Sequence, residues 1–223
     1  MVRDRLCGPS LAGDDEPLAA RAWPHAQKKT LIAREQDAEA RAAWRAEIAD
    51  LDSATLVFLD ETSTPTNLTP THGRAPRGQR VVGRVPRRRW QAVTLLATLT
   101  PAGFGPGFQF AGALDRPVFE AYVERILVPA LQPGQTVILD NLSVHKSARA
   151  RQLIEAAGCR LLFLPTYSPD FNPIEPAFSQ LKSRLHRAEA RTVDAILAAT
   201  QDAYPALTAG HARNYYRNAG YKL

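Results

Sequence analysis

The chain has 223 residues, 45% of them hydrophobic and 22% charged, which is enough for one sizeable hydrophobic core. Its net charge of +6 fits a polyanionic partner, and it contains neither an apolar run long enough to span a membrane nor a secretory signal. The two cysteines, Cys7 and Cys159, form no metal-type spacing and no disulfide framework, which favours a reducing cytoplasm.

The sequence pattern divides the chain into three segments. Residues 1–29 mix Gly, Pro, Ala and both charge signs without a period, so we expect a loose N-terminal segment. Residues 30–53 show helical periodicity, with Trp44 and Ile48 on one face, and are expected to form a linker helix that carries no chemistry. Residues 54–223 are expected to form a single domain.

Strand and helix patterns alternate in that domain. Strands are predicted over residues 55–62, 79–85 (the weakest), 90–100, 136–141 and 159–165. Helices are predicted over residues 116–131 and 146–158, from Pro173 onward, and over residues 192–204 and 208–218. Early strands joined by short turns favour antiparallel pairing, and later strands separated by helices favour parallel crossovers. The order therefore predicts an α/β fold with a mixed five-stranded sheet flanked by helices, as in ribonuclease-H-like proteins.

The stretch LPTYSPDFNPIEPAFSQLK, residues 164–182, combines a proline-rich loop with a helix. Asn172 suits the N-cap, Pro173 the first helical position, and Glu175 the acidic position of a capping box. The local interpretation is a capped amphipathic helix in which Glu175 is only a capping acid.

Three acids suggest a second interpretation. Asp60 and Asp140 each close an apolar strand, where a carboxylate either caps a loop or faces a cleft, and Glu175 opens a helix. If the two strands are neighbours, the rigid loop can bring Glu175 over both aspartates. Clustered carboxylates repel one another unless cations neutralise them, and oxygen ligands favour Mg²⁺ or Mn²⁺. Two such ions about 4 Å apart can stabilise both the attacking and the leaving oxygen of a phosphodiester.

These motifs also carry a family resemblance. The chain resembles the DDE transposases of bacterial insertion sequences, in the mariner-like branch often called the six-thirty family, through the segments LVFLDET, GRAPRGQR, VILDNLSVHK, LPTYSPDFNPIE, FSQLK and NAGY. Thirty-four residues separate Asp140 from Glu175, a spacing typical of the mariner-like group. The resemblance covers roughly residues 25–223.

The resemblance implies a function. Asp60, Asp140 and Glu175 would be the catalytic residues and would bind two Mg²⁺ or Mn²⁺ ions, while Glu61 is expected to be structural. The expected activity is metal-dependent cleavage and strand transfer in cut-and-paste transposition, with a TA dinucleotide as target. The implied partners are transposon ends, target DNA and a second copy of the chain in the active complex. The expected location is the bacterial cytoplasm, at the nucleoid.

A basic segment includes the weakest predicted strand, between the two clear strands 55–62 and 90–100. Residues 72–90 contain seven arginines and no acid, which predicts either a solvated hairpin or an arm that grips DNA phosphates. The candidate DNA-binding residues are Arg74, Arg77, Arg80, Arg84, Arg87, Arg88, Arg89, Lys146 and Lys182. Trp90 is expected in the core, with base stacking as the alternative, and His145 either orients a carboxylate or touches a phosphate.

Members of this family usually carry helix-turn-helix modules before the catalytic domain, and no pair of compact helices is evident here. The chain is therefore expected to be the catalytic half of a split reading frame or a truncated copy. Two other functions stay open: a metal-dependent nuclease or resolvase that only hydrolyses, and an inactive remnant that binds DNA.

Overall fold

The computed structural model describes residues 33–70, 72–85 and 89–223, and the predicted loose segment 1–29 lies outside them. The strands are β1 (Leu56–Pro65), β2 (Ala92–Thr100), β3 (Gly103–Ala111), β4 (Thr136–Leu139) and β5 (Arg160–Phe163). The α-helices are α1 (Ala38–Ala49), α2 (Arg116–Tyr122), α3 (Val128–Ala130), α4 (Ala148–Ala156), α5 (Ile174–Ala188), α6 (Val193–Ala203) and α7 (Ala209–Asn218). A π-helical turn, η2 (Val123–Leu127), joins α2 to α3, and the 3-10 turns are η1 (Ser53–Thr55), η3 (Pro169–Phe171) and η4 (Tyr204–Ala206).

The five strands form one mixed sheet in the order β3-β2-β1-β4-β5. The pairs β1–β2 and β2–β3 are antiparallel, whereas β1–β4 and β4–β5 are parallel. The predicted α/β class, the number of strands and the change from antiparallel to parallel pairing are therefore confirmed.

One predicted strand is wrong and one strand was missed. Residues 79–85 form no strand, and β3 occupies Gly103–Ala111 instead. The β3 segment is rich in glycine and contains Pro106, so it lacks the β-branched pattern that marks a strand. It is an edge strand, where proline is tolerated. Gly107 is required by packing, because a Cβ there would lie 2.8 Å from the hydroxyl of Tyr204.

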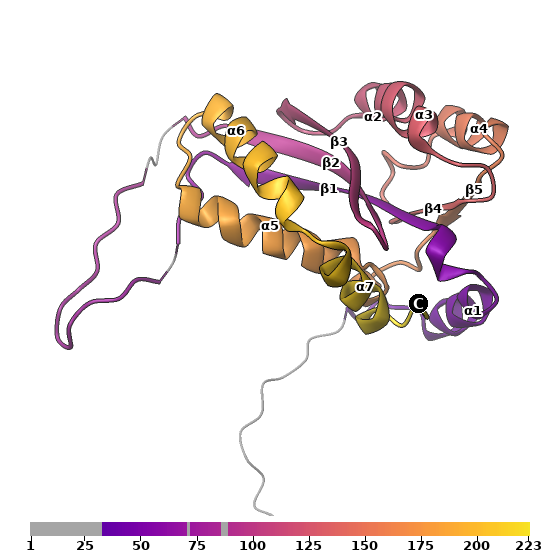
Figure 1. The fold of residues 1–223 in the computed structure, drawn as a ribbon, viewed down its shortest axis with the longest axis horizontal. Helices are drawn as coiled ribbons and strands as arrows, with labels where there is room; N and C mark the ends of the chain where they lie inside the picture. The colour runs from indigo at the N-terminus through magenta and orange to yellow at the C-terminus, as the bar shows by residue number, and fades with distance from the viewer. Residues whose placement is uncertain (1–32, 71, 86–88) are drawn as a thin grey trace, which may run out of the picture. The chain divides into compact units, whose positions relative to one another are not determined.

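Helices cover both faces of the sheet (Figure 1). Successive residues of β1 point to opposite faces, so Phe58 joins one core and Leu59 the other. The first core includes residues of α1, α5 and α7, among them Trp44, Phe178 and Tyr216. The second includes residues of α2, η2 and α4. The predicted linker helix, α1, thus packs into the same core as the sheet.

The connection between β1 and β2 projects away from the sheet (Figure 1). Its described residues 72–80 are exposed and form no helix or strand. Within the described part of the chain, no helix is both long and apolar enough to cross a membrane.

Candidate active site

The register of two parallel strands aligns Asp60 with Asp140. Phe58 of β1 pairs with Ile138 of β4, so the residues two positions further along each strand lie side by side on the same face. Asp140 directly follows β4, as predicted. Asp60 does not end its strand, since β1 continues to Pro65 alongside β2. It lies instead just beyond the last residue of β1 that pairs with β4.

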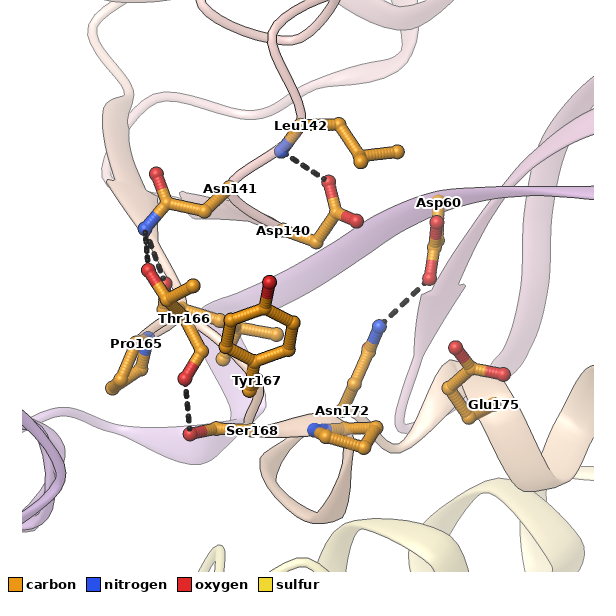
Figure 2. Close-up of a pocket in the computed structure, with 12 residues that line it drawn as sticks. Asp60, Asp140, Asn141, Leu142, Pro165, Thr166, Tyr167, Ser168, Asn172 and Glu175 are labelled. Carbon is orange, nitrogen blue, oxygen red and sulfur yellow. Dashed lines mark hydrogen bonds between the residues drawn. The ribbon is translucent and has the colours of Figure 1, made fainter. Parts of the chain in front are cut away.

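Both aspartates and Glu175 line one pocket of about 350 Å³ (Figure 2). Glu175 lies in the first turn of α5. The rest of the wall is formed by Asn141, Leu142, Leu164, Pro165, Thr166, Tyr167, Ser168, Pro169 and Asn172. The structure therefore brings the three acids, which are far apart in the sequence, to a single cavity.

Asn172 does not cap α5 as the sequence suggested. The N-cap position is occupied by Pro173, and no side-chain hydrogen bond caps the helix. The amide of Asn172 instead donates to Oδ2 of Asp60 at 2.8 Å, and its own Oδ1 is buried without a partner among the described residues. Asp60 is buried, so this bond supplies a partner for an oxygen that water cannot reach.

The carboxylate of Asp60 is strongly perturbed. Its side chain is buried, with 6% of the residue exposed. Burial, followed by the nearby charges of Asp140, Glu61 and Glu175, raises the pKa of Asp60 to about 8. Burial likewise raises the pKa of Glu175, although the charge of Lys182 opposes the shift. The acids of the pocket therefore disfavour one another's ionised forms.

A fully buried imidazole links Asp140 to Glu61. Nδ1 of His145 lies 2.6 Å from Oδ1 of Asp140, and Nε2 lies 3.0 Å from Oε2 of Glu61. Burial alone would lower the pKa of His145, but the hydrogen bond to Asp140 and the close contact with the Glu61 carboxylate outweigh it and raise the pKa to about 9. Sequence reasoning treated Glu61 as structural and left His145 open.

The pocket suits a hard cation by its chemistry. In the described part of the chain, no three His, Cys, Asp or Glu side chains already stand together as metal ligands. Nevertheless, the acids lining the pocket offer oxygen donors alone, and their repulsion is what a divalent cation would relieve. The residues that could hold Mg²⁺ or Mn²⁺ are Asp60, Asp140 and Glu175.

The helix α1 supports the wall of this pocket, which the sequence did not indicate. Gln36, just before α1, donates to the carbonyl oxygen of Tyr167 at 2.8 Å. Arg41 donates to both carboxylate oxygens of Asp170, at 2.8 and 2.6 Å, and its guanidinium lies 4.2 Å from the ring centre of Phe171. The loop between β5 and α5 is therefore held from outside as well as by Asn172.

The predicted DNA-binding residues lie mostly away from the acids. Arg74, Arg77, Arg80, Arg84 and Arg89 are exposed on the β1–β2 connection, while Arg87 and Arg88 lie outside the described residues. Lys146 is exposed. Lys182 lines a separate groove along α5 with Ser179, His186 and Arg187. Trp90 is 55% exposed, so its predicted place in the core is wrong.

Parts of this chain are similar in sequence to known proteins. A family model described as DDE superfamily endonuclease matches residues 55–197. The transposable element Tc1 transposase of Caenorhabditis elegans is 30% identical over 120 residues, which make up 52% of this chain and 44% of that protein. The chain thus spans less than half the length of this curated relative.

Solved structures match the fold. The Mos1 transposase paired-end complex with the left transposon end has a TM-score of 0.67 at 15% identity, over 88% of this chain and 62% of that chain. The mariner Mos1 paired-end complex with Mg has a TM-score of 0.66 at 14% identity, over 89% and 63% of the two chains. The predicted ribonuclease-H-like architecture is confirmed. Because the matching family model covers more than half of the chain, the protein belongs to the DDE superfamily endonuclease family.

Proposed function

We propose that this chain is the catalytic domain of a DNA transposase that cleaves phosphodiesters and transfers strands with the help of divalent metal ions. The observation that carries the proposal is the meeting of Asp60, Asp140 and Glu175 in one pocket of a DDE-family chain. The solved relatives add support, since Mos1 paired-end complexes are known with Mg and with Mn. The finer proposal is a bacterial insertion sequence of the six-thirty family that uses two ions.

The side chains of the pocket have distinct tasks in this proposal. Asp60, Asp140 and Glu175 would hold the metal ions, and Asn172 would keep the Asp60 carboxylate oriented. When bound, Mg²⁺ or Mn²⁺ supplies positive charge that stabilises the oxygens of the reacting phosphodiester. The exposed arginines of the β1–β2 connection would hold DNA through its phosphates.

The proposed reaction has two steps that need no covalent link to the protein. Water first hydrolyses a phosphodiester at the end of the element, which frees a 3′ hydroxyl. That hydroxyl then attacks a phosphodiester of target DNA, at a TA dinucleotide, and displaces its 3′ oxygen. Two copies of the chain would act together on the two ends, as a homodimer.

Substitution of the acids tests the proposal. Asp60→Asn, Asp140→Asn and Glu175→Gln should each reduce Mn²⁺- or Mg²⁺-dependent cleavage of end-containing DNA below detection, because each removes a charge that holds metal. Glu124→Gln is the matched control, since Glu124 pairs with Arg149 at the protein surface and does not line the pocket. Near-normal cleavage by the Glu175→Gln variant would return Glu175 to a purely structural role.

A second assay separates transposition from its alternatives. Pre-cleaved ends should be joined to target DNA by the parent chain. Cleavage without joining would identify a nuclease or resolvase, and DNA binding without cleavage an inactive remnant.

A further inference from the structure

We propose that His145 and Glu61 are positioning residues that fix the carboxylate of Asp140 from the side of the sheet opposite the pocket. The inference rests on the proposed function, in which Asp140 holds a metal ion. Neither His145 nor Glu61 lines the pocket, and His145 contacts the pocket acids through Asp140.

The linkage crosses the sheet. Glu61 follows Asp60 in β1, so its side chain points to the other face, where Leu59 and Phe119 form the second core. His145 has no exposed surface and lies with its ring centre 5.0 Å from that of Phe119. It reaches from this second core to Asp140, which belongs to the pocket.

The turn after β4 fixes the imidazole. The backbone N–H of His145 donates to the carbonyl oxygen of Leu142 at 3.1 Å, and the N–H of Ser147 donates to the carbonyl oxygen of His145 at 2.9 Å. Ser147 in turn caps α4. The ring thus starts from a backbone held on both sides, and a buried side chain without freedom to rotate is well suited to orient another.

The two oxygens of Asp140 are consequently different. Oδ1 accepts from the backbone N–H of Leu142 at 3.1 Å and lies 2.6 Å from Nδ1 of His145. No hydrogen bond from a described residue reaches Oδ2, and Figure 2 shows this second oxygen turned away from Leu142. The arrangement therefore reserves one oxygen of Asp140 for the pocket, and a rotation of the carboxylate would break two contacts.

A pair of substitutions separates positioning from packing. The amide nitrogen of Asn can stand near the place of Nδ1, and that of the longer Gln near the place of Nε2. His145→Asn therefore keeps a donor for Asp140, whereas His145→Gln keeps only a partner for Glu61. Both remove the ring contact with Phe119.

Binding of Mn²⁺ alone to the full chain, measured by isothermal titration calorimetry, is the readout. We expect His145→Gln to weaken Mn²⁺ binding roughly 10- to 100-fold, the range for residues that orient metal ligands, and His145→Asn to weaken it much less. Equal losses in the two variants, or no loss in His145→Gln, would overturn the proposal. Glu61→Leu and Glu61→Gln lose the same charge, but only Gln keeps a polar group beside Nε2, so Glu61→Leu should weaken binding more. Equal affinities for these two variants would remove Glu61 from the proposal.

The Asp140→Asn variant shows whether a negative result rules out the positioning role alone or the proposed metal site as well. Unchanged Mn²⁺ affinity in that variant means that the proposed metal site is wrong. Lost affinity there, with parent-like affinity in His145→Gln, means that only the positioning role is wrong. A proton NMR spectrum of the metal-free chain tests the linkage itself, because a buried N–H this close to a carboxylate should give an exchange-protected, low-field resonance. If that resonance does not move in Asp140→Asn, the linkage is absent.

Discussion

Asp60 is a carboxylate in a place that disfavours its own charge. Its pKa of about 8 lies above its ordinary value of 3.8, so between these two pH values the folded chain retains a proton that the unfolded chain has lost. The unfolded state therefore gains relative stability as the pH rises through this window. His145 and Glu175 act in the same direction, because their pKa values are also raised by folding.

The first prediction is a stability profile for Asp60→Asn. In the absence of metal, the melting temperature of the parent chain should fall from pH 5 to pH 8, and that of the variant should fall less, because Asn cannot ionise. The variant should be the more stable protein at pH 8 by a few degrees, at about 2–4 °C per kcal/mol for a chain of this size. Differential scanning calorimetry across the window measures this. If the melting temperatures of the parent and the variant fell in parallel with pH, ionisation of Asp60 would not be the cause of the pH dependence.

The acids of the site were visible in the sequence, but their partners were not. Asp140 follows an apolar strand, and the proline-rich loop draws attention to Glu175, so local pattern was enough to single them out. The contact of Asn172 with Asp60 joins residues 112 positions apart, and locally Asn172 looks like a helix cap. The contact between Glu61 and His145 was also not visible in the sequence, because it depends on how the turn after β4 packs behind the sheet.

Among the elements, α1 has a larger role than its sequence suggested. Its contacts with the loop after β5 join residues about 130 positions apart, which no local pattern reveals. Arg41 is largely enclosed, whereas the side chain of Asp170 is 54% exposed, so the pair alone is worth only about 0.5–1 kcal/mol. Its importance lies in restraining the loop that forms one wall of the pocket.

A double-mutant cycle tests this restraint. Arg41→Ala and Asp170→Ala should each speed amide hydrogen exchange in residues 164–171. The double variant should add little to Arg41→Ala, because that change already removes the contact with Asp170. The pair Arg149→Ala and Glu124→Ala, an ion pair elsewhere on the surface, is the control and should leave exchange in the loop unchanged. Additive effects of the Arg41 and Asp170 changes would mean that they act separately.

The strand β3 shows where pattern-based prediction stops. Three of its nine residues are glycines, and two of these lie against Tyr204: Gly105 accepts from its hydroxyl at 2.8 Å, and Gly107 leaves room for the ring. Gly107 is thus required by a neighbour about 100 residues away, whereas a Cβ at Gly105 would meet Thr98 of β2. Glycine and proline count against a strand in a local pattern, and their packing reasons are not local. The number of strands was correct only because one false strand replaced one true one.

The whole molecule presents an arginine-rich connection beyond the sheet. If it grips phosphates, Arg74, Arg77 and Arg80 together should contribute up to roughly 2.7 to the slope of log affinity against log salt, at about 0.9 for each phosphate contact. Replacing all three with Ala should flatten the slope and weaken transposon-end and random duplexes equally, because phosphate contacts carry no base sequence. Fluorescence anisotropy over a salt series measures both effects.

A charge-matched control uses Arg149, Arg151 and Arg160, which form ion pairs with acids of the chain. Their replacement should leave the slope near that of the parent. An unchanged salt slope in the variant that lacks Arg74, Arg77 and Arg80 would show that these arginines lie in a solvated loop without DNA contacts.

The parallel pairing of β1 with β4 has a mechanical consequence. Neighbouring strands lie about 4.8 Å apart, and the paired residues Phe58 and Ile138 hold the strands together two positions before Asp60 and Asp140. The spacing of the two aspartates therefore tolerates little adjustment. Glu175 enters from a helix whose start depends on a loop held by side chains. The pocket therefore has a rigid side, formed by the two paired strands, and a more adaptable side, formed by the start of α5. Lengthening the loop between β5 and α5 by one residue would displace Glu175 and leave Asp60 and Asp140 in register. Weakening the side-chain contacts that hold this loop would have the same selective effect.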